Sequence, residues 1–391
     1  MGDHTSLLII GAGPFGLALS AYARAHEIEH TIVGRPMEFW KQHMPKQMLL
    51  RSHCDWHLDP LGEHTIEQYL QALELRPKDV EPLSLAFYLD YCNWFIQQKE
   101  LEIVDAQVES LDRSGESFIA TLDNGTTITA DRAVIAVGFL YFENIPDSLR
   151  ALFPSGRFSH TSQTCDFSDL ENKSVLIIGG RQSAFEWTAL VHEAGAKEIH
   201  VSYRHPTPSF EESDWSWVAG AVSSIATEPG WFRKLPSEER DRINQRQWAE
   251  GRLKLEPWLA PRITNDKTTL HPESEIVACE EKPNGRMEIT LNDGTKFIAD
   301  HVILATGYKV DVSRIPFLAN GNILEQLTTR NNFPALDDYL ESNIPGLFFT
   351  SMCATQDFGS FFGFTVSVRA SASLIGSRLN QSALDQRFES P

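Results

Sequence analysis

The chain has 391 residues, which is enough for two ordinary domains or one large split one. Its hydrophobic share of 42% and charged share of 22% are those of a globular protein and exclude a disordered one. The formal net charge of −19 disfavours nucleic acid and anionic membranes as partners, since both recruit lysine and arginine.

The sequence has no sign of a secreted or membrane-spanning protein. Residues 1–10 lack the basic flank, apolar core and cleavage site of a signal peptide. No apolar run approaches the roughly 20 residues that cross a bilayer. The five cysteines include no C-x-x-C pair, which disfavours a redox dithiol and a zinc ribbon. We therefore expect a cytoplasmic protein without membrane association.

The first predicted elements are a strand, a glycine turn and a helix. Apolar residues 7–10 predict a buried strand, and Gly11-x-Gly13-x-x-Gly16 follows at the start of a helix that runs to about Arg24. Gly11 permits the tight turn, Gly13 lets a pyrophosphate approach the backbone, and Gly16 lets the helix pack on the strand. The helix N-terminus adds free N–H groups and a favourable dipole, so this segment predicts a dinucleotide site.

The next strand, residues 31–33, ends without the acidic residue that usually binds the adenosine ribose. Gly34 and Arg35 stand there instead. Arg35 either stacks on an adenine or is simply solvated, and the sequence leaves both interpretations open.

The second half of the chain repeats the pattern of the first. An Asn-Gly pair ending at Gly125 and an Asp-Gly pair ending at Gly294 each mark a hairpin, and each hairpin leads into an apolar strand that ends at Ala-x-Gly. Upstream of the second hairpin, residues 175–178 predict a strand that runs into another glycine turn and a helix to about Glu193. The spacing between the two turns equals that between the two Ala-x-Gly ends to within one residue.

These patterns predict an α/β fold with two Rossmann-like dinucleotide-binding domains of the glutathione-reductase type, the second inserted into the first. In this interpretation residues 1–150 and 308–391 form the outer domain, and residues 170–304 form the inserted one.

Residues 206–262 are an additional polar, Trp-rich segment of the inserted domain, partly helical around Ser237 to Arg252. Its tryptophans are interpreted either as a lid or substrate wall, or as side chains buried against the neighbouring domain.

The second turn departs from the usual glycine pattern. In the turn that begins at Gly179, Arg181 takes the place of the middle glycine. Either Arg181 hydrogen-bonds a pyrophosphate itself, or the site has degenerated. The next strand, residues 198–201, favours binding, because Ser202 and Arg204 at its end are the hydroxyl and the cation that the 2′-phosphate of NADPH needs.

Together these features resemble the flavin-containing monooxygenases and the related N-hydroxylating and Baeyer–Villiger flavoenzymes, the class B flavoprotein monooxygenases. The resemblance rests on the turns at Gly11 and Gly179, on Gly156-x-x-x-His160 before the second turn, and on Ala-Thr-Gly-Tyr ending at Tyr308. It implies FAD in the outer domain and NADPH in the inserted one.

The resemblance also implies the chemistry. Reduced flavin would add O2 at its C4a carbon, and the (hydro)peroxyflavin would oxygenate a small-molecule nucleophile, with amine N-hydroxylation or S-oxidation expected before Baeyer–Villiger insertion. The expected partners are this substrate and O2, and a homo-oligomer is compatible with them.

Candidate site residues follow from the same resemblance. A stretch ending at Leu50 is similar to the flavin-facing segment of amine N-hydroxylases. Ser52 or His53 would donate a hydrogen bond to the oxygenated flavin, and Arg51 would hold NADP+. The full set of cofactor-binding candidates is Gly11, Ala12, Gly13, Pro14, Phe15, Gly16, Trp40, Met48, Leu50, Val108, Gly138, Gly179, Gly180, Arg181, Gln182, Ser183, Ser202, Arg204, Thr306, Gly307, Tyr308 and Phe361.

His53 and His57 flank Asp55, a spacing that suggests a metal site. Without a second cluster of ligands we interpret this segment as a loop and expect no metal.

Departures from the family pattern leave the subfamily open. Arg181 breaks the second turn, Thr164 stands where typical flavin-containing monooxygenases have an aromatic residue, and the Gly-Asp closing turn of disulfide reductases is missing. One alternative is an NAD(P)H-dependent flavin reductase of the quinone- or ferredoxin-reductase type, without a redox disulfide. The other is a non-catalytic flavoprotein. In that case NADPH would not bleach the bound flavin.

Overall fold

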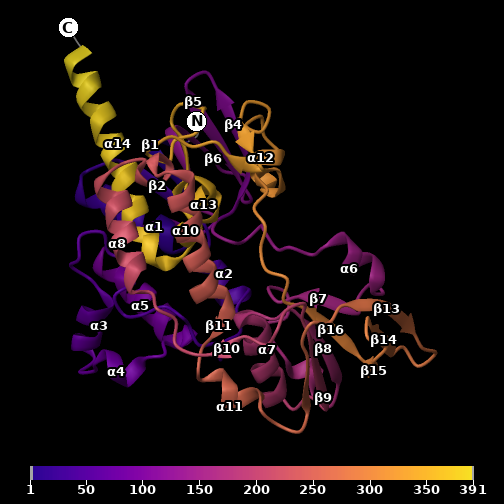
Figure 1. The fold of residues 1–391 in the computed structure, drawn as a ribbon. Helices are drawn as coiled ribbons and strands as arrows, with labels where there is room; N and C mark the ends of the chain where they lie inside the picture. Colours follow the sequence, from indigo (N-terminus) through magenta and orange to yellow (C-terminus); the bar gives the residue numbers. More distant parts are fainter. Residues whose placement is uncertain (1–2, 390–391) are drawn as a thin grey trace.

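The computed structural model describes residues 3–389, and the side chains of residues 4–380. Two lobes are joined by a pair of crossing segments (Figure 1). The first lobe is built on a seven-stranded sheet of order β3-β2-β1-β6-β5-β4, with β19 also paired to β6. Its strands are β1 (Asp3–Ile10), β2 (His30–Val33), β3 (Ile103–Val104), β4 (Val108–Ser114), β5 (Ser117–Leu122), β6 (Thr127–Ile135) and β19 (Leu347–Phe349).

Strand β6 organises this sheet. One edge pairs in parallel with β1, and the other edge is divided between two partners. Its first half pairs antiparallel with β5, with Thr127 opposite Thr121, and its second half pairs in parallel with β19, with Ala133 opposite Leu347. The parallel part carries near-continuous apolar runs because both of its faces are covered.

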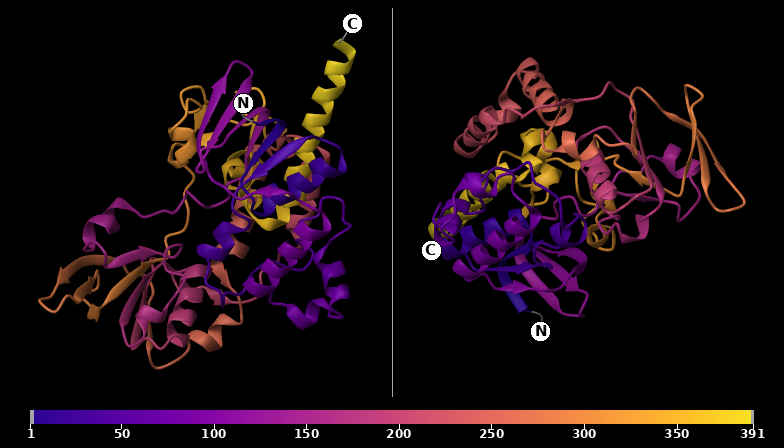
Figure 2. Two further views of the ribbon diagram at one scale, coloured as in Figure 1. Left: turned by 180° about the vertical axis from the view of Figure 1, so that it is seen from behind. Right: turned by 90° about the horizontal axis from the view of Figure 1, so that it is seen from below.

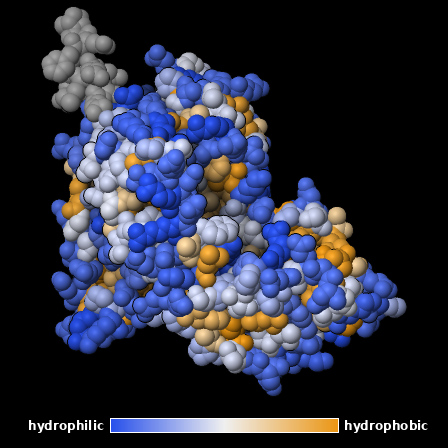
Figure 3. Space-filling model, in the orientation of Figure 1, coloured by the Kyte–Doolittle hydropathy of each residue, from blue (hydrophilic) through white to orange (hydrophobic). Residues whose placement is uncertain are grey.

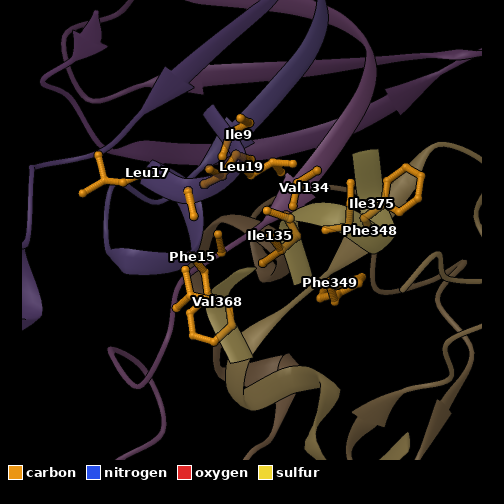
Figure 4. Packing of buried hydrophobic residues seen from close by; sticks show 14 of the residues in the cluster. Ile9, Phe15, Leu17, Leu19, Val134, Ile135, Phe348, Phe349, Val368 and Ile375 are labelled. Atoms are coloured by element: carbon orange, nitrogen blue, oxygen red, sulfur yellow. The ribbon is translucent and has the colours of Figure 1, made fainter. Parts of the chain in front are cut away.

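Helices α1 (Pro14–Ala25) and α14 (Val368–Glu389) pack against each other beside these parallel strands. Ile9, Val134, Phe348 and Ile375 meet in the buried core there (Figure 4). The two helices approach so closely that a Cβ at Gly376 would lie 2.0 Å from Cε1 of Tyr22.

Shorter elements complete the first lobe. They are α2 (Glu38–Gln42), α3 (Ile66–Ala72), α4 (Pro77–Val80), α5 (Leu85–Gln98), α12 (Pro316–Ala319), α13 (Thr355–Phe358), the ladder β17 (Thr329–Arg330) with β18 (Phe333–Pro334), and the 3₁₀ turns η3 (Val312–Arg314), η4 (Ser351–Ala354), η5 (Ser360–Gly363) and η6 (Thr365–Ser367).

The second lobe holds a five-stranded, all-parallel sheet of order β12-β9-β8-β16-β7 and an antiparallel ribbon β13-β14-β15. β7 lies before residue 170, so the second lobe begins earlier than the sequence pattern indicates. The strands are β7 (Phe158–His160), β8 (Ser174–Ile178), β9 (Glu198–Ser202), β12 (Thr268–His271), β13 (Ile276–Glu281), β14 (Met287–Leu291), β15 (Lys296–Ala299) and β16 (His301–Leu304); the helices are α6 (Asp147–Leu152), η1 (Ser168–Leu170) and α7 (Gln182–Glu193).

The fold therefore confirms the predicted α/β architecture of two Rossmann-like units, one inserted in the other. The internal repeat corresponds to β5-β6 in the first lobe and to β14-β15-β16 in the second. The first copy is one continuous strand where the second is interrupted at Asp300 between β15 and β16.

The two crossing segments between the lobes are hydrogen-bonded to each other. The amide of Asn144 donates to the carbonyl of Gly307 at 2.9 Å, and the amide of Lys309 donates to the carbonyl of Phe142 at 2.8 Å. His160, at the end of β7, adds a contact of 3.0 Å between Nε2 and the Gly307 carbonyl. The connection between the lobes, called the strap below, thus consists of two short segments, around residues 142–144 and 307–309.

Residues 206–262, called the insert below, follow β9 in sequence and pack on both lobes. Leu255 and Leu259 belong to the core of the second lobe. Val218, Ala221, Val222 and Ile225 of the insert belong to the core of the first lobe. Helix α8 lies beside α14 (Figures 1 and 2). The elements of the insert are β10 (Ser209–Phe210), α8 (Ser216–Thr227), α9 (Trp231–Lys234), α10 (Ser237–Trp248), the π-helical turn η2 (Ala249–Leu253), β11 (Lys254–Leu255) and the start of α11 (Leu259–Ile263).

The face of the molecule drawn in Figure 3 is mainly hydrophilic, with separate apolar patches on both lobes. Among the described residues, no helix combines the length and the hydropathy that crossing a membrane requires.

A substitution in the core of the first lobe should destabilise the protein. Phe348 is 1% exposed, so we expect Phe348→Ala to lower the free energy of unfolding by about 3–5 kcal/mol through lost burial and a cavity. Val277→Ala is the control, because Val277 is 56% exposed and its truncation should change stability by no more than about 0.5 kcal/mol. Urea unfolding of both variants measures the difference, and equal midpoints would contradict this account of the core.

Candidate functional site

A cavity of about 810 Å³ lies where the two lobes and the insert meet. Both glycine turns contribute to its wall, together with the strap and the segment of residues 351–366. Of the residues singled out from the sequence, those that line this cavity are Gly11, Ala12, Gly13, Pro14, Phe15, Trp40, Met48, Leu50, Arg51, Ser52, Val108, Gly138, Arg181, Gln182, Ser183, Thr306, Gly307, Tyr308 and Phe361.

The first turn has the geometry that a bound pyrophosphate requires. Gly11 has φ +116°, and a Cβ there would lie 2.4 Å from the Ala136 carbonyl oxygen. A Cβ at Gly16 would lie 1.8 Å from the Gly11 carbonyl oxygen, so Gly16 supports the turn from behind the cavity. At Gly13 a Cβ would meet nothing within 4 Å, and no side chain caps the N-terminus of α1 there. The open backbone and free N–H groups fit a dinucleotide phosphate.

An acidic residue stands near the expected adenosine ribose although the strand end lacks one. Glu38, at the start of α2, lines the cavity, and its side chain is 12% exposed. Both of its carboxylate oxygens accept hydrogen bonds of 2.8 Å from Nε2 of Gln107. Arg35 pairs with Glu38 at 3.1 Å and with Asp123 at 3.4 Å, so two carboxylates hold its side chain at this wall.

In the second turn the glycines are packed against the protein, and the arginine is the residue that reaches the cavity. A Cβ at Gly179 would lie 2.5 Å from the Ala305 carbonyl oxygen, and one at Gly180 would lie 2.5 Å from Cβ of Tyr203, so both glycines pack against strand ends. Arg181 reaches the cavity, where its guanidinium carbon lies 4.0 Å from the centroid of the Trp248 ring. Burial and the charge of Arg252 lower the pKa of Arg181. Its Nη1 is buried without a hydrogen-bond partner among the described residues.

Arg51 joins the first lobe to the insert. Its Nε donates to Oε1 of Glu256 at 2.7 Å, and its Nη1 donates to the Gly251 carbonyl at 3.0 Å. The guanidinium carbon also lies 5.4 Å from the centroid of the Trp215 ring. The neighbouring Ser52 hydroxyl pairs with the hydroxyl of Thr365 at 3.1 Å, and both residues line the cavity.

His53 requires a correction. Its side chain is exposed, outside the cavity wall, with its ring centroid 5.7 Å from that of Trp56. Because its side chain is exposed and outside the cavity wall, His53 is not placed to donate a hydrogen bond to a flavin.

Ser202 requires a correction as well. It is 2% exposed, and its hydroxyl pairs with that of Ser274 at 2.8 Å, so it is not free to bind a phosphate. Arg204 beside it is exposed and lies outside the cavity wall.

His53 and His57, the two histidines around Asp55, differ in their surroundings. His57 is 8% exposed, and its Nε2 accepts a hydrogen bond of 2.8 Å from Arg369. Burial and the charge of Arg369 lower the pKa of His57 to about 4. Among the described residues the acidic group Asp59, Glu63 and His64 has metal-like spacing, but the Lys99 ammonium lies 3.0 Å from Asp59 and 2.7 Å from Glu63.

The cysteines are not arranged for disulfide chemistry. All five are described, all are free, and none lines the cavity. Burial raises the pKa of the Cys54 thiol and of the Cys353 thiol to about 12 in each case, which keeps both protonated.

Several cavity residues could not be found from sequence motifs. They are Glu38, Gln107, Gln247, Arg252 and Thr365. Gln247 is 8% exposed, and its Oε1 has no hydrogen-bond partner among the described residues. The one local signal in the sequence is Glu38, an acidic residue four positions after Gly34, the glycine that follows β2.

Comparison with known proteins begins with the sequence. A family model described as pyridine nucleotide-disulphide oxidoreductase matches residues 5–361. An uncharacterized CzcO-like oxidoreductase from Geobacillus kaustophilus is 26% identical over 221 residues, which are 54% of this chain and 57% of that protein. A ferredoxin–NADP reductase from Thermus thermophilus is 25% identical over 251 residues, 61% of this chain and 66% of that protein. The matched region thus spans less than two thirds of either curated relative.

Solved structures share the fold over nearly the whole chain. An ornithine N-hydroxylase from Kutzneria sp. 744, with reduced FAD, NADP+ and L-ornithine, has a TM-score of 0.79 at 14% identity, covering 97% of this chain and 100% of that one. The reduced form of an ornithine hydroxylase from Pseudomonas aeruginosa has a TM-score of 0.75 at 18% identity, covering 97% and 99%. At these identities the likeness concerns the fold.

A methyl group at Gly13 should interfere with the cofactor while sparing the fold. Its Cβ would project into open space, so we expect apo Gly13→Ala to unfold at the wild-type temperature but to bind FAD at least about tenfold more weakly, or about 1.4 kcal/mol. Fluorescence titration of the apoprotein with FAD measures this. Gly16→Ala is the contrasting variant, since its Cβ would strike the Gly11 carbonyl and should reduce both stability and FAD binding. Unchanged FAD affinity of Gly13→Ala would contradict this site.

Protonation of His57 should contribute to the pH dependence of stability. Its folded pKa of about 4 lies below the ordinary 6.5, so between these values the unfolded chain takes up a proton that the folded protein does not. The free energy of unfolding should therefore fall as the pH decreases through this window, by up to about 3 kcal/mol from this residue. Urea unfolding across the window should give a shallower pH slope for His57→Asn, and parallel slopes would contradict the assignment.

Proposed function

This chain belongs to the pyridine nucleotide-disulphide oxidoreductase family, whose members use a flavin and a pyridine nucleotide, and we propose that it is an FAD-dependent NADPH monooxygenase. Its substrate is a small nucleophile, an amine or a sulfide. One observation carries the proposal: both glycine turns open into a single cavity that the insert covers and that no cysteine lines within residues 4–380.

The first turn and α1 bind FAD in this proposal. The N-terminus of α1 and the open backbone at Gly13 accept the pyrophosphate, and Glu38 accepts the hydroxyls of the adenosine ribose. FAD, when bound, takes a hydride from NADPH and activates O2 for transfer to the substrate.

The second turn binds NADPH. Arg181, Gln182 and Ser183 face the cavity at the N-terminus of α7, where they meet the pyrophosphate. Arg204 is the cation near the 2′-phosphate, because it follows β9 and is exposed without an ion-pair partner among the described residues.

The insert excludes water from the reacting end of the cavity. Trp215 and Trp248 of the insert line this space together with Phe361 of the first lobe and Tyr308 of the strap. An apolar enclosure strengthens electrostatic interactions inside it and protects an activated oxygen from side reactions. The paired hydroxyls of Ser52 and Thr365 supply a donor to stabilise developing charge on oxygen.

The wall also restricts the substrate. Gln247 presents a buried, unpaired acceptor oxygen, which a substrate N–H group would satisfy. Glu38 is the one carboxylate on the described wall, and it is already bound by Arg35 and Gln107. The site therefore favours a substrate with a single reactive amine over a diamine, whose second ammonium would lack a partner.

A flavin reductase without a redox disulfide is the second candidate, favoured by the curated ferredoxin–NADP reductase relative. It would pass electrons to an external acceptor and would not need the cavity to be covered.

The two functions differ in the fate of O2. FAD-loaded protein reduced by NADPH without oxygen and then mixed with ¹⁸O2 should place one labelled oxygen in an amine or sulfide product, detected by mass spectrometry. Rapid reduction of quinone acceptors, with no label in any of a panel of amines, sulfides and ketones, would establish the reductase instead.

Removal of the Ser52 hydroxyl should uncouple the reaction. We expect Ser52→Ala to lower the product formed per NADPH consumed by roughly tenfold or more and to raise hydrogen peroxide release, with the KM for NADPH unchanged. The control is Ser223→Ala, at an exposed position of α8 outside the cavity wall, which should behave like the wild type. Equal coupling in both variants would show that Ser52 does not act on the reacting oxygen.

A further inference from the structure

The end of α10 contacts both lobes. Trp248, its last residue, stacks on Arg181 of the second lobe at 4.0 Å. Three residues later, the carbonyl of Gly251 accepts a hydrogen bond of 3.0 Å from Arg51 of the first lobe. Trp248 directly precedes the π-helical turn η2, and Gly251 lies within it; this conformation is rare but frequent at functional sites. The turn directs Arg252 to the cavity wall.

The three guanidinium groups at this junction differ in their partners. Arg51 is neutralised by Glu256, a residue that is 7% exposed. Within residues 4–380, neither Arg181 nor Arg252 has an ion pair, and Nη1 of Arg181 is a buried donor with no acceptor. The charge of Arg252 is close enough to lower the pKa of Arg181. Two like charges that repel each other and lack a counter-charge form a site for an anion.

The position of this pair indicates which anion it binds. Arg181 stands in place of the glycine that would let a pyrophosphate approach the backbone, at the N-terminus of α7. The Trp248 ring covers one face of the guanidinium and leaves its edge, with Nη1, for hydrogen bonding.

We propose that Arg181 and Arg252, held by Trp248, form a clamp for the pyrophosphate of NADPH, to which the insert contributes one of the two cations. The clamp rests on the proposed use of NADPH. It adds a role for the insert, a segment that is not part of the glycine-turn motif. In place of the close backbone approach that Arg181 prevents, two charge-assisted contacts bind the phosphates. Arg252 is thus a binding residue, and Trp248 is a positioning residue.

The test uses FAD-loaded protein and the dissociation constants of NADP+ and of nicotinamide mononucleotide, which lacks the pyrophosphate. Arg252→Gln should raise the Kd of NADP+ by about tenfold to a hundredfold and change that of the mononucleotide much less. Arg252→Lys should restore part of the affinity, since it retains the charge but not the fork of donors. The loss of affinity should also appear as a raised KM for NADPH in flavin reduction.

Two further variants separate positioning from stability. Trp248→Leu should weaken NADP+ binding while melting within a few degrees of the wild type, because Trp248 is 52% exposed. Arg242→Gln is the matched control on the same helix and should bind NADP+ normally. The Arg242 side chain is 72% exposed, and among the described residues its one ion pair is with Glu239.

The outcomes distinguish the clamp from the proposed function. Normal NADP+ affinity in Arg252→Gln would overturn the clamp alone, and if the KM of the substrate rose instead, the anion would be a carboxylate or phosphate of the substrate. Failure of the unsubstituted protein to bind NADP+ would remove the proposed function together with the clamp.

Discussion

Arg51 donates hydrogen bonds to Glu256 and to the carbonyl of Gly251, and these bonds hold the insert over the cavity. The two charged side chains are 19% and 9% exposed, so their desolvation offsets much of their attraction. Removal of one partner would leave a half-buried charge unpaired, which costs more than the intact pair contributes. The ion pair therefore acts mainly by specifying where the insert lies, and the enclosure of the cavity depends on that position.

The insert gives the protein a third wall that neither Rossmann-like unit supplies. Its α8 is buried against α14 of the first lobe, while Trp248 at the end of α10 stacks on the second lobe. A segment anchored to both lobes responds to any change in their relative position, and the strap between the lobes is only two hydrogen-bonded segments wide. A movement of the second lobe at Arg181 would therefore shift the part of the cavity wall that Trp248 forms.

The electrostatics of the cavity are opposite to those of the whole molecule. The chain carries a net charge of −19, yet the cavity wall includes Arg51, Arg181 and Arg252, and Glu38 is the one carboxylate on the described wall. In the proposed function, these cations would attract the phosphates of the dinucleotides. The burial that lowers the pKa of Arg181 also makes each unpaired donor there more favourable for a bound anion.

Local patterns in the sequence determined the two glycine turns, the hairpins, α1 and α7, and hence the α/β fold of two Rossmann-like units. Such features depend on hydrophobic periodicity and on φ values that glycine alone adopts readily, and both are set within a few residues. Tertiary structure alone decided that helix α8 packs on the first lobe and that Glu38 lies at the cavity wall beside Gln107. It also decided that the Ser202 hydroxyl pairs with that of Ser274 and that the His53 side chain is exposed outside the cavity wall. Arg51 and Glu256 are 205 positions apart. A local pattern in the sequence predicts that a residue is buried or paired. Which residue it contacts depends on the packing of segments that meet only in the folded chain.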